Sequence, residues 1–409
     1  MYQRTSILCA ATAFFSIILL LGCSGVGTSV DSADPIPPQN PLPPAPPDAK
    51  AHSVYAVFPP VTPKDDNYDD FDTYVLTHSD VAGVTVGMPW NQIESDTTPG
   101  AYDFARFDDS MQHFFAAGKI VNIIVEPVKE GGVNTFTPDY VLGADWASSC
   151  CGSPPVDVVT CNSFEGNGNP GTGMPVVYEA PFQTAYKNFM KAVMEHYNGN
   201  AYVPVGYIRF GLVMGGEAAP LCHDQWPLQG APDFRTAFLN NYVKPMLEYE
   251  ASLHPAMQIL ANIHAVGSPV DNGYADMEAD WAVENGFGFG NNGLQSSDLP
   301  NYAAGAQCNA NWCASFIKYV GTTFPNGNGI LLELQTLNPT DPTGASETGS
   351  LATLLPFAGE HYANTMELRA AELLLAFDPN YNRTSGANVA YAPYASAYAE
   401  AIHSYITSK

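Results

Sequence analysis

The sequence is poor in basic residues. It has 15 Lys and Arg against 41 Asp and Glu, and its formal net charge is -26. Proteins that bind nucleic acids gather cations on one face to neutralise phosphates, and no basic stripe occurs here. We therefore expect no nucleic-acid partner, and anionic substrates are disfavoured. Charged residues make up only 14% of the chain and hydrophobic residues 46%, which is ample for a large core.

The sequence also lacks the common nucleotide and metal motifs. No GxGxxG or GxxxxGK[ST] pattern follows an early strand, so the nucleotide-binding folds lose their main support. A zinc site would need CxxC spacing or clustered histidines, and neither is present. We predict a protein without a cofactor or a metal.

One long apolar run occurs near the N-terminus, from Ile7 to Leu21. It is short for a membrane span and has no charged stop-transfer flank, so it predicts an export signal. Its end, Leu20-Leu21-Gly22-Cys23, resembles the lipobox of bacterial lipoproteins, which implies that Cys23 is lipidated and becomes the new N-terminus. The alternative is an ordinary signal peptide with a chance cysteine.

A proline-rich segment, PIPPQNPLPPAPP, lies between Asp34 and Asp48 and predicts an extended, semi-rigid spacer. We therefore expect a signal peptide over residues 1–22, a lipidated cysteine and tether over 23–50, and one folded domain over 51–409. The domain would be exported and anchored by lipid to the bacterial cell envelope, facing the periplasm or the exterior. Contact with the membrane would be through the lipid alone.

Six cysteines remain beyond Cys23, which in an exported chain predicts disulfides. They are Cys150, Cys151, Cys161, Cys222, Cys308 and Cys313. Cys308 and Cys313 could close a small loop, and the other four could staple two more. Six cysteines allow fifteen pairings, so the connectivity stays open.

From residue 51 onward, strands and helices alternate. Short apolar runs rich in β-branched residues predict eight strands: 52–58, 81–88, 120–125, 205–214, 257–263, 286–290, 329–334 and 363–366. Helical spacing predicts helices at 107–117, 182–197, 233–252, 274–284, 309–322, 351–361, 368–377 and 391–406. Eight strand–helix units in continuous alternation predict an α/β fold, a single (β/α)8 TIM barrel. A long insert at 129–177 interrupts the pattern and is of a length usually linked to function.

Catalytic groups of such barrels lie at the carboxyl ends of the strands, so the polar residues that close each apolar run are the candidates. They are Trp90, Asn91, Glu126, Glu217, His264, Glu333, Gln335 and Glu367. Acidic residues dominate this set.

Glu333 lies in the otherwise apolar run Gly329-Ile-Leu-Leu-Glu-Leu-Gln335. An unpaired charge there would cost several kcal/mol, roughly, so it requires a partner or a function. A purely structural ion pair with Arg209 of the fourth strand is the alternative. Such a pair is also compatible with catalysis, because a guanidinium would keep a nucleophilic carboxylate ionised.

Glu217 follows the fourth strand, in the stretch GLVMGGEAAP, and by composition alone would be a solvated turn residue. Carboxylates on strands four and seven of one barrel nevertheless match glycoside hydrolysis, which needs a general acid and a second group that attacks the sugar or activates water.

The sequence resembles clan A, the large clan of retaining glycoside hydrolases with (β/α)8 barrels. The resemblance is carried by Met88-Pro-Trp-Asn-Gln-Ile-Glu94, Pro99-Gly-Ala-Tyr-Asp-Phe104, Phe107-Asp108 and the segment from Pro175 to Tyr197. It implies Glu217 as acid/base and Glu333 as nucleophile. One position departs from the clan: Gly216 stands where an asparagine usually holds the sugar 2-hydroxyl.

Several other residues are candidates for substrate binding. Trp90 and Trp226, with Tyr302 and Trp312, could offer aromatic faces to a sugar, although core packing is the commoner fate of any one aromatic. His264, Asn91, Glu126 and Gln335 are polar candidates, and an internal, hydrogen-bonded role for His264 is equally compatible. Glu94 is either a subsite residue or a charge at a helix start.

We therefore predict a monomeric glycoside hydrolase that acts on a β-linked poly- or oligosaccharide. The alternative is a non-catalytic, glycan-binding surface lipoprotein on a degenerate barrel. A structural envelope lipoprotein is a third hypothesis, against which the buried carboxylate argues.

Overall fold

A computed structural model describes thirteen stretches of the chain: residues 52–58, 77–129, 136–160, 173–197, 205–213, 225–253, 258–263, 272–299, 312–324, 329–336, 339–361, 363–378 and 390–408. The chain divides into two units, Met1–Asn40 and Pro41–Lys409, and all described residues lie in the second. The predicted signal, Cys23 and the whole tether lie outside the described residues.

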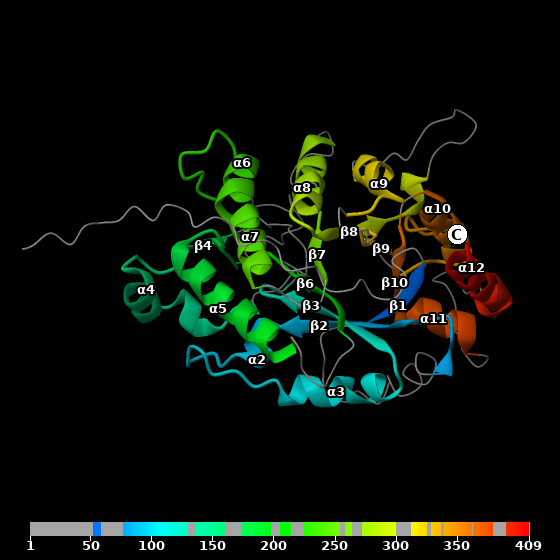
Figure 1. The fold of residues 1–409 in the computed structure, drawn as a ribbon, viewed down its shortest axis with the longest axis horizontal. Helices are drawn as coiled ribbons and strands as arrows, with labels where there is room; N and C mark the ends of the chain where they lie inside the picture. Colours follow the sequence, from blue (N-terminus) through cyan, green and yellow to red (C-terminus); the bar gives the residue numbers. More distant parts are fainter. Residues whose placement is uncertain are drawn as a thin grey trace, which may run out of the picture. The chain divides into compact units, whose positions relative to one another are not determined.

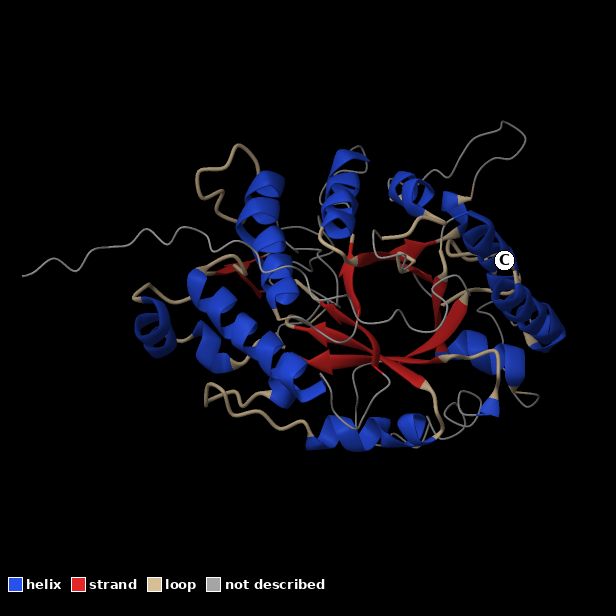
Figure 2. Ribbon diagram, in the orientation of Figure 1, coloured by secondary structure: helices blue, strands red, loops and turns tan. Residues whose placement is uncertain are grey.

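Eight parallel strands form a closed barrel in the order β1-β10-β9-β8-β7-β6-β3-β2. The strands are β1 (Ser53–Phe58), β2 (Gly83–Pro89), β3 (Ile120–Glu126), β6 (Val205–Phe210), β7 (Gln258–Asn262), β8 (Gly288–Leu294), β9 (Leu332–Thr336) and β10 (Thr365–Arg369). Helices surround the strands (Figures 1 and 2). The predicted (β/α)8 fold is confirmed, and each predicted strand overlaps an observed one.

The helices that the structure describes follow the predicted order. They are α2 (Trp90–Ile93), α3 (Ala105–Ala116), α4 (Ala144–Cys151), α5 (Ala180–Tyr197), α6 (Phe234–Phe238), α7 (Lys244–Ser252), α8 (Asn272–Glu284), α9 (Cys313–Tyr319), α10 (Leu351–His361), α11 (Ala370–Phe377) and α12 (Ala395–Thr407). The insert after β3 contains α4, the 3-10 turn η1 (Asp139–Leu142), and the antiparallel pair β4 (Val158–Thr160) and β5 (Gly173–Pro175). Within the described residues, no helix is long and apolar enough to cross a membrane.

The helix predicted over 233–252 is interrupted by a π-helical turn, η4 (Leu239–Val243), between α6 and α7. Pro245, in the first turn of α7, has no N–H to donate to the carbonyl of Asn241. That carbonyl instead accepts a hydrogen bond from Gln183 Nε2 of α5, at 3.0 Å. The hydrogen bond from Gln183 therefore satisfies the part-buried carbonyl that the proline leaves without an α-helical donor.

The two faces of the barrel strands have different chemistry. One alternate set of residues, including Val84, Ile123, Ile208 and Leu334, is buried in the main hydrophobic cluster with the surrounding helices. The other set points into the barrel, where Tyr207, Leu260 and Leu331 make a small separate cluster. The remainder of the inward set is unusually polar, and it forms the site described below.

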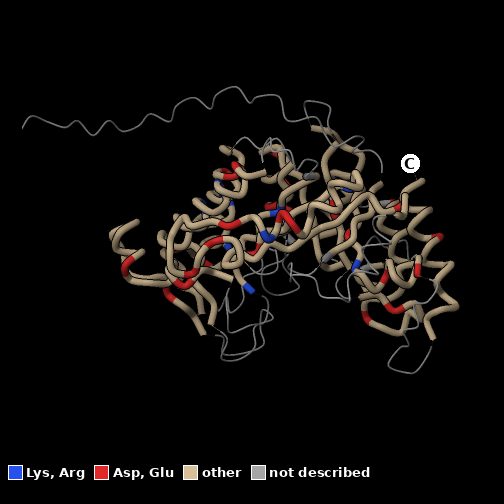
Figure 3. Tube along the Cα trace, turned by 90° about the horizontal axis from the view of Figure 1, so that it is seen from below, with Lys and Arg blue, Asp and Glu red and all other residues tan. Residues whose placement is uncertain are grey.

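Two cysteines of the insert, Cys150 and Cys151, are bonded to each other. Cys313 is also disulfide-bonded. A bond between adjacent cysteines staples no loop, so it differs from the two loops expected for the first four cysteines, and the pairing of Cys308 with Cys313 stays a prediction. Acidic residues are spread along the described chain, and basic residues are few (Figure 3).

Candidate active site

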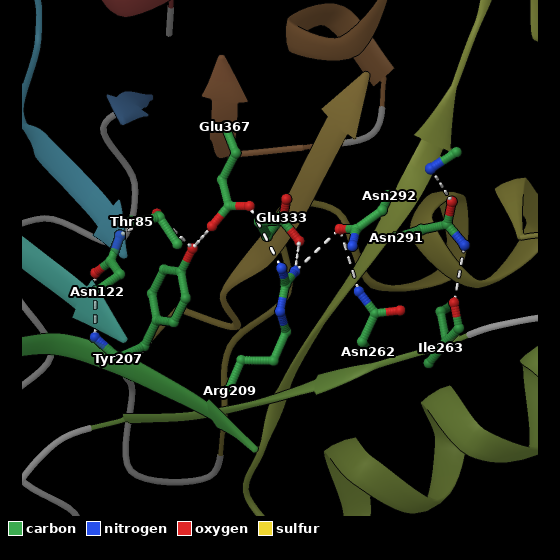
Figure 4. Close-up of polar contacts among 11 residues, drawn as sticks. Thr85, Asn122, Tyr207, Arg209, Asn262, Ile263, Asn291, Asn292, Glu333 and Glu367 are labelled. Carbon is green, nitrogen blue, oxygen red and sulfur yellow. Dashed lines mark hydrogen bonds and ion pairs between the residues drawn. The ribbon is translucent and has the colours of Figure 1, made fainter. Parts of the chain in front are cut away.

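A buried ion-pair network lies inside the barrel and is centred on Arg209 of β6 (Figure 4). Arg209 Nη1 lies 3.1 Å from Glu333 Oε2 on β9, and Arg209 Nη2 lies 3.6 Å from Glu367 Oε2 on β10. All three side chains are essentially inaccessible to solvent. The pair between Arg209 and Glu333, given above as the alternative to a catalytic Glu333, is present, and it includes a second carboxylate that the sequence did not pair with it.

The second carboxylate is held from the other side by Tyr207, whose hydroxyl donates to Glu367 Oε1. Tyr207 Oη also lies 3.4 Å from Thr85 Oγ1, which accepts a hydrogen bond from Asn122 Nδ2 at 3.3 Å. Burial raises the pKa of Tyr207 well above its usual value, and the charges of Glu367 and Glu333 raise it further. Tyr207 therefore stays protonated and can only stabilise Glu367 as a donor.

Two glycines on the inward faces of the strands make room for this network. A Cβ at Gly290 of β8 would lie 2.0 Å from Glu333 Oε2, and one at Gly206 would lie 2.4 Å from Asn122 Oδ1. Gly290 is the register partner of Glu333, so the carboxylate fills the space beside the neighbouring strand. The glycine content of the sixth predicted strand thus has a direct role in placing Glu333.

An amide branch extends from Arg209 in the opposite direction. Arg209 Nη1 donates to Asn292 Oδ1 on β8 at 3.0 Å, and Asn262 Nδ2 on β7 donates to the same oxygen at 3.3 Å. Asn292 is half-buried, whereas Asn262 is 7% exposed. The branch places two amide side chains next to the Arg209–Glu333 pair.

Sequence reasoning missed Tyr207, Asn262 and Asn292. Their signal was the inward parity of their strands: Tyr207 and Arg209 are two residues apart on β6, and Gly290 and Asn292 are two residues apart on β8. A polar residue two positions from a candidate along a barrel strand shares its face, so a search two residues before each strand-end candidate finds Asn262, which precedes His264 by two positions.

Trp90 is not placed as a sugar platform, which corrects the prediction. Its ring is fully buried and packs among Phe182, Tyr186 and Phe189 of α5. Its indole Nε1 donates to Glu94 at 2.6 Å. This aromatic residue, which directly follows a strand, packs in the layer between the sheet and the helices.

Glu94 links three segments of this region through its hydrogen bonds, and it is neither a subsite residue nor a charge at a helix start. Its carboxylate accepts from Trp90 Nε1, from the backbone N–H of Gly100 at 2.7 Å and from the Tyr140 hydroxyl at 2.8 Å. Burial raises the pKa of Glu94, and these three donors oppose that rise.

Trp226 is also buried, at 4% exposure, and packs against Tyr178, Phe234 and Phe238. Core packing, the alternative to a sugar platform, is therefore what the structure shows for Trp226 as well. Trp312 is likewise 4% exposed. The aromatic rings of this chain that were expected to meet substrate serve the core wherever the structure describes them.

The remaining predicted residues divide into three groups. Gln335 is 6% exposed on β9 and is in register with Glu367, so it shares the interior with the network. Glu126 ends β3, and Asn91 lies in α2, both only partly buried. Glu217, His264 and Cys23 lie outside the described residues.

The site is thus an acidic, hydrogen-bonded cluster inside a parallel barrel, with one guanidinium between two carboxylates. Such a cluster can hold a carboxylate in its ionised form and can present hydrogen-bonding groups to a polar, uncharged ligand. Among the described residues, no group of three or more His, Cys, Asp or Glu is arranged to hold a metal ion.

No family model matches the chain, and no curated protein matches its sequence. Solved structures with a similar course include the catalytic domain of β-amylase from Paenibacillus polymyxa, at 12% identity and a TM-score of 0.49, covering 78% of this chain and 93% of that one. An endo-β-1,4-xylanase of glycoside hydrolase family 10 from Gloeophyllum trabeum has 12% identity, a TM-score of 0.48, and coverage of 87% and 96%. Xylanase 10B from Thermotoga maritima has 10% identity, a TM-score of 0.45, and coverage of 88% and 97%.

Proposed function

We propose that this protein is a glycoside hydrolase that cleaves a β-linked, neutral glycan with retention of configuration. Glu333 is the nucleophile and Glu217 is the acid/base in this proposal. The observation that carries it is the buried Glu333 carboxylate on the seventh barrel strand, held by Arg209 in a network of polar side chains inside the barrel. A catalytic role explains why an acidic group is retained where an apolar one would pack as well.

The ion pair gives Glu333 the property a nucleophile needs. A guanidinium at 3.1 Å favours the ionised carboxylate, whereas burial alone would favour the neutral acid. Glu367 is the second carboxylate on the same guanidinium, at a longer 3.6 Å, and it also accepts from Tyr207. Arg209 therefore interacts more closely with Glu333 than with Glu367.

The proposed reaction has two displacements. In the first, a Glu333 oxygen bonds to the anomeric carbon while the glycosidic C–O bond breaks, and Glu217 gives its proton to the leaving oxygen. In the second, Glu217 takes a proton from water, whose oxygen bonds to the anomeric carbon as the bond to Glu333 breaks. A separation of about 5.5 Å between the two carboxyl groups is expected, since inverting enzymes require about 6.5–9.5 Å.

A second candidate is a glycan-binding protein without turnover. The full burial of Glu333, with its carboxylate engaged by Arg209, is the observation that favours it. On this hypothesis the Arg209–Glu333–Glu367 cluster maintains the shape of the barrel interior, and binding of a glycan does not require Glu333 as a reacting group.

The two candidates are separated by a panel of β-linked polysaccharides with a reducing-sugar readout. Glu333→Gln and Glu217→Gln should each lower turnover by at least about 100-fold while binding of the glycan is retained. Glu250→Gln is the matched control, because Glu250 is a fully buried glutamate on α7, away from the network, and should leave turnover unchanged. Full activity of both variants would refute the catalytic assignment, and binding without any turnover by the wild type would establish the second candidate.

We further propose that the protein is exported and anchored through a lipid on Cys23. The support is the lipobox-like Leu20-Leu21-Gly22-Cys23 and the proline-rich segment after it. Mass spectrometry of the N-terminal peptide from bacterial membranes should show a diacylglyceryl modification, and Cys23→Ser should abolish it. An unmodified peptide that begins elsewhere would refute the anchor without affecting the proposed activity.

A further inference from the structure

The side-chain oxygen and nitrogen of an asparagine have nearly the same shape, so their positions are assigned from the hydrogen bonds that they make. In the amide branch, only one assignment is possible for Asn262 and Asn292. Arginine can only donate, so the side-chain atom of Asn292 that faces Arg209 Nη1 must be its oxygen. The atom of Asn262 that faces this same oxygen must then be its nitrogen. The charge of Arg209 therefore orients both asparagines in sequence (Figure 4).

This orientation leaves one acceptor and one donor available. Asn262 Oδ1 is buried, points away from Asn292, and has no hydrogen-bond partner within the described part of the chain. For Asn292 Nδ2, the described residues likewise supply no acceptor, since both bonds of this side chain are made by its oxygen. Buried polar groups are nearly always satisfied, so an orphaned acceptor on a side chain that is 7% exposed indicates a missing donor.

The chemistry of the missing partner is constrained by its surroundings. An anion would be repelled by Glu333 and Glu367, and it could not donate to Asn262 Oδ1. A hydroxyl group can donate to one amide and accept from another, and two adjacent hydroxyls can engage an orphaned acceptor and a free donor together. A neutral sugar ring has this pattern.

We propose that Asn262 and Asn292 form a hydroxyl-binding pair that holds a sugar ring beside Glu333. This inference rests on the proposed function and adds to it the residues that recognise the substrate. It also accounts for Gly216: the amide that the resembled clan places before the acid/base is replaced, in this barrel, by amides on the fifth and sixth strands, β7 and β8.

The test uses Asn262→Leu, which replaces the amide by an apolar group of similar size. Without ligand, this variant should melt about 2–4 °C higher than the wild type, because the orphaned acceptor is gone. Asn291→Leu is the matched control. Asn291 is an equally buried asparagine, but its amide donates to the Ile263 carbonyl and its oxygen accepts from the Gly293 N–H, both at 2.8 Å. Its removal should lower the melting temperature.

Binding is measured by calorimetry in the Glu333→Gln background, with β-linked gluco-, xylo-, manno- and galacto-tetrasaccharides. Asn262→Leu should weaken the tightest ligand by about 10-fold or more, and Asn291→Leu by less than about 2-fold. Asn292→Asp, which keeps the oxygen that Arg209 and Asn262 need but removes the donor, should also weaken binding.

Three results would overturn the inference: undiminished affinity in Asn262→Leu, a melting temperature of Asn262→Leu that falls as in Asn291→Leu, or a Glu333→Gln parent that binds none of the four sugars. Its failure is distinct from failure of the proposed function. If the wild type hydrolyses the glycan and the Asn262→Leu variant does so equally fast, the hydroxyl-binding pair alone is refuted. If binding depends on Asn262 but the wild type shows no turnover, hydrolysis alone is refuted.

Discussion

Glu250 offers a sharp test of the packing between α7 and the barrel. It is 0% exposed, and within the described residues neither carboxylate oxygen has a hydrogen-bond partner. The nearby hydroxyls are committed elsewhere: Tyr186 donates to the Gly211 carbonyl and Tyr242 to the Leu212 carbonyl, each at 2.6 Å. Burial raises the pKa of Glu250 well above its usual value, so the neutral acid persists to higher pH in the native state than in the unfolded chain.

The sign of the pH effect follows from proton counting. Between the pKa of Glu250 in the unfolded chain and its higher value in the native state, the native state binds more protons, so stability falls as pH rises. The slope is at most about 1.4 kcal/mol per pH unit for one group. Glu250→Gln, which cannot ionise, should match the wild type at about pH 4 and become progressively more stable than it at higher pH.

Glu250→Met should stabilise the protein at every pH, because it also removes the unsatisfied polar atoms, worth about 1–3 kcal/mol. The assay is urea denaturation of wild type and both variants from pH 4 to pH 9. Parallel pH profiles for Glu250→Gln and wild type, or a lower midpoint for Glu250→Met at neutral pH, would refute the assignment of a buried, unpaired, neutral acid.

Two further substitutions test the geometry of the site and its support. Gly290→Ala places a Cβ 2.0 Å from Glu333 Oε2, so the carboxylate must move away from Arg209. We expect the free energy of unfolding in urea to fall by about 1–3 kcal/mol and the rate of glycan hydrolysis to fall by at least about 100-fold. Wild-type stability and wild-type activity in this variant would contradict the proposed placement of Glu333. Glu94→Ala removes the acceptor of three hydrogen bonds and leaves their donors unpaired. We expect the free energy of unfolding to fall by about 3 kcal/mol or more, measured from the lower urea midpoint. A fall below about 1 kcal/mol would show that water replaces the carboxylate.

The fold was predictable because its signals are periodic and local. Strands buried on both faces are continuous apolar runs, and their alternation with helices identifies the barrel without any long-range information. The boundaries of the strands were harder to predict. The eighth strand was predicted at 363–366 but runs over Thr365–Arg369, so Glu367 lies inside the strand, facing the barrel, instead of after it. Because Glu367 is charged, the apolar pattern ended before it, and so did the predicted strand.

The candidate site was predictable in part. Glu333 and its pairing with Arg209 follow from the cost of an isolated charge in an apolar run. The fates of Trp90 and Trp226 did not follow, because a tryptophan after a strand is compatible with either the site or the helix layer, and only the neighbours decide. The roles of Asn262 and Asn292 depend on which strands are adjacent across the barrel, which no local pattern specifies.

The closure of the barrel sets an order of events for folding. The seam is the pairing of β1 with β10, and next to it the His52 ring stacks on Tyr405 and donates to its carbonyl, across 353 positions of the chain. Every other strand of the barrel lies between these partners in the sequence, so the first strand must wait with an open edge until the last is made. Contacts this distant in sequence form slowly. Over that interval, the open edge of β1 can pair with a strand of another chain.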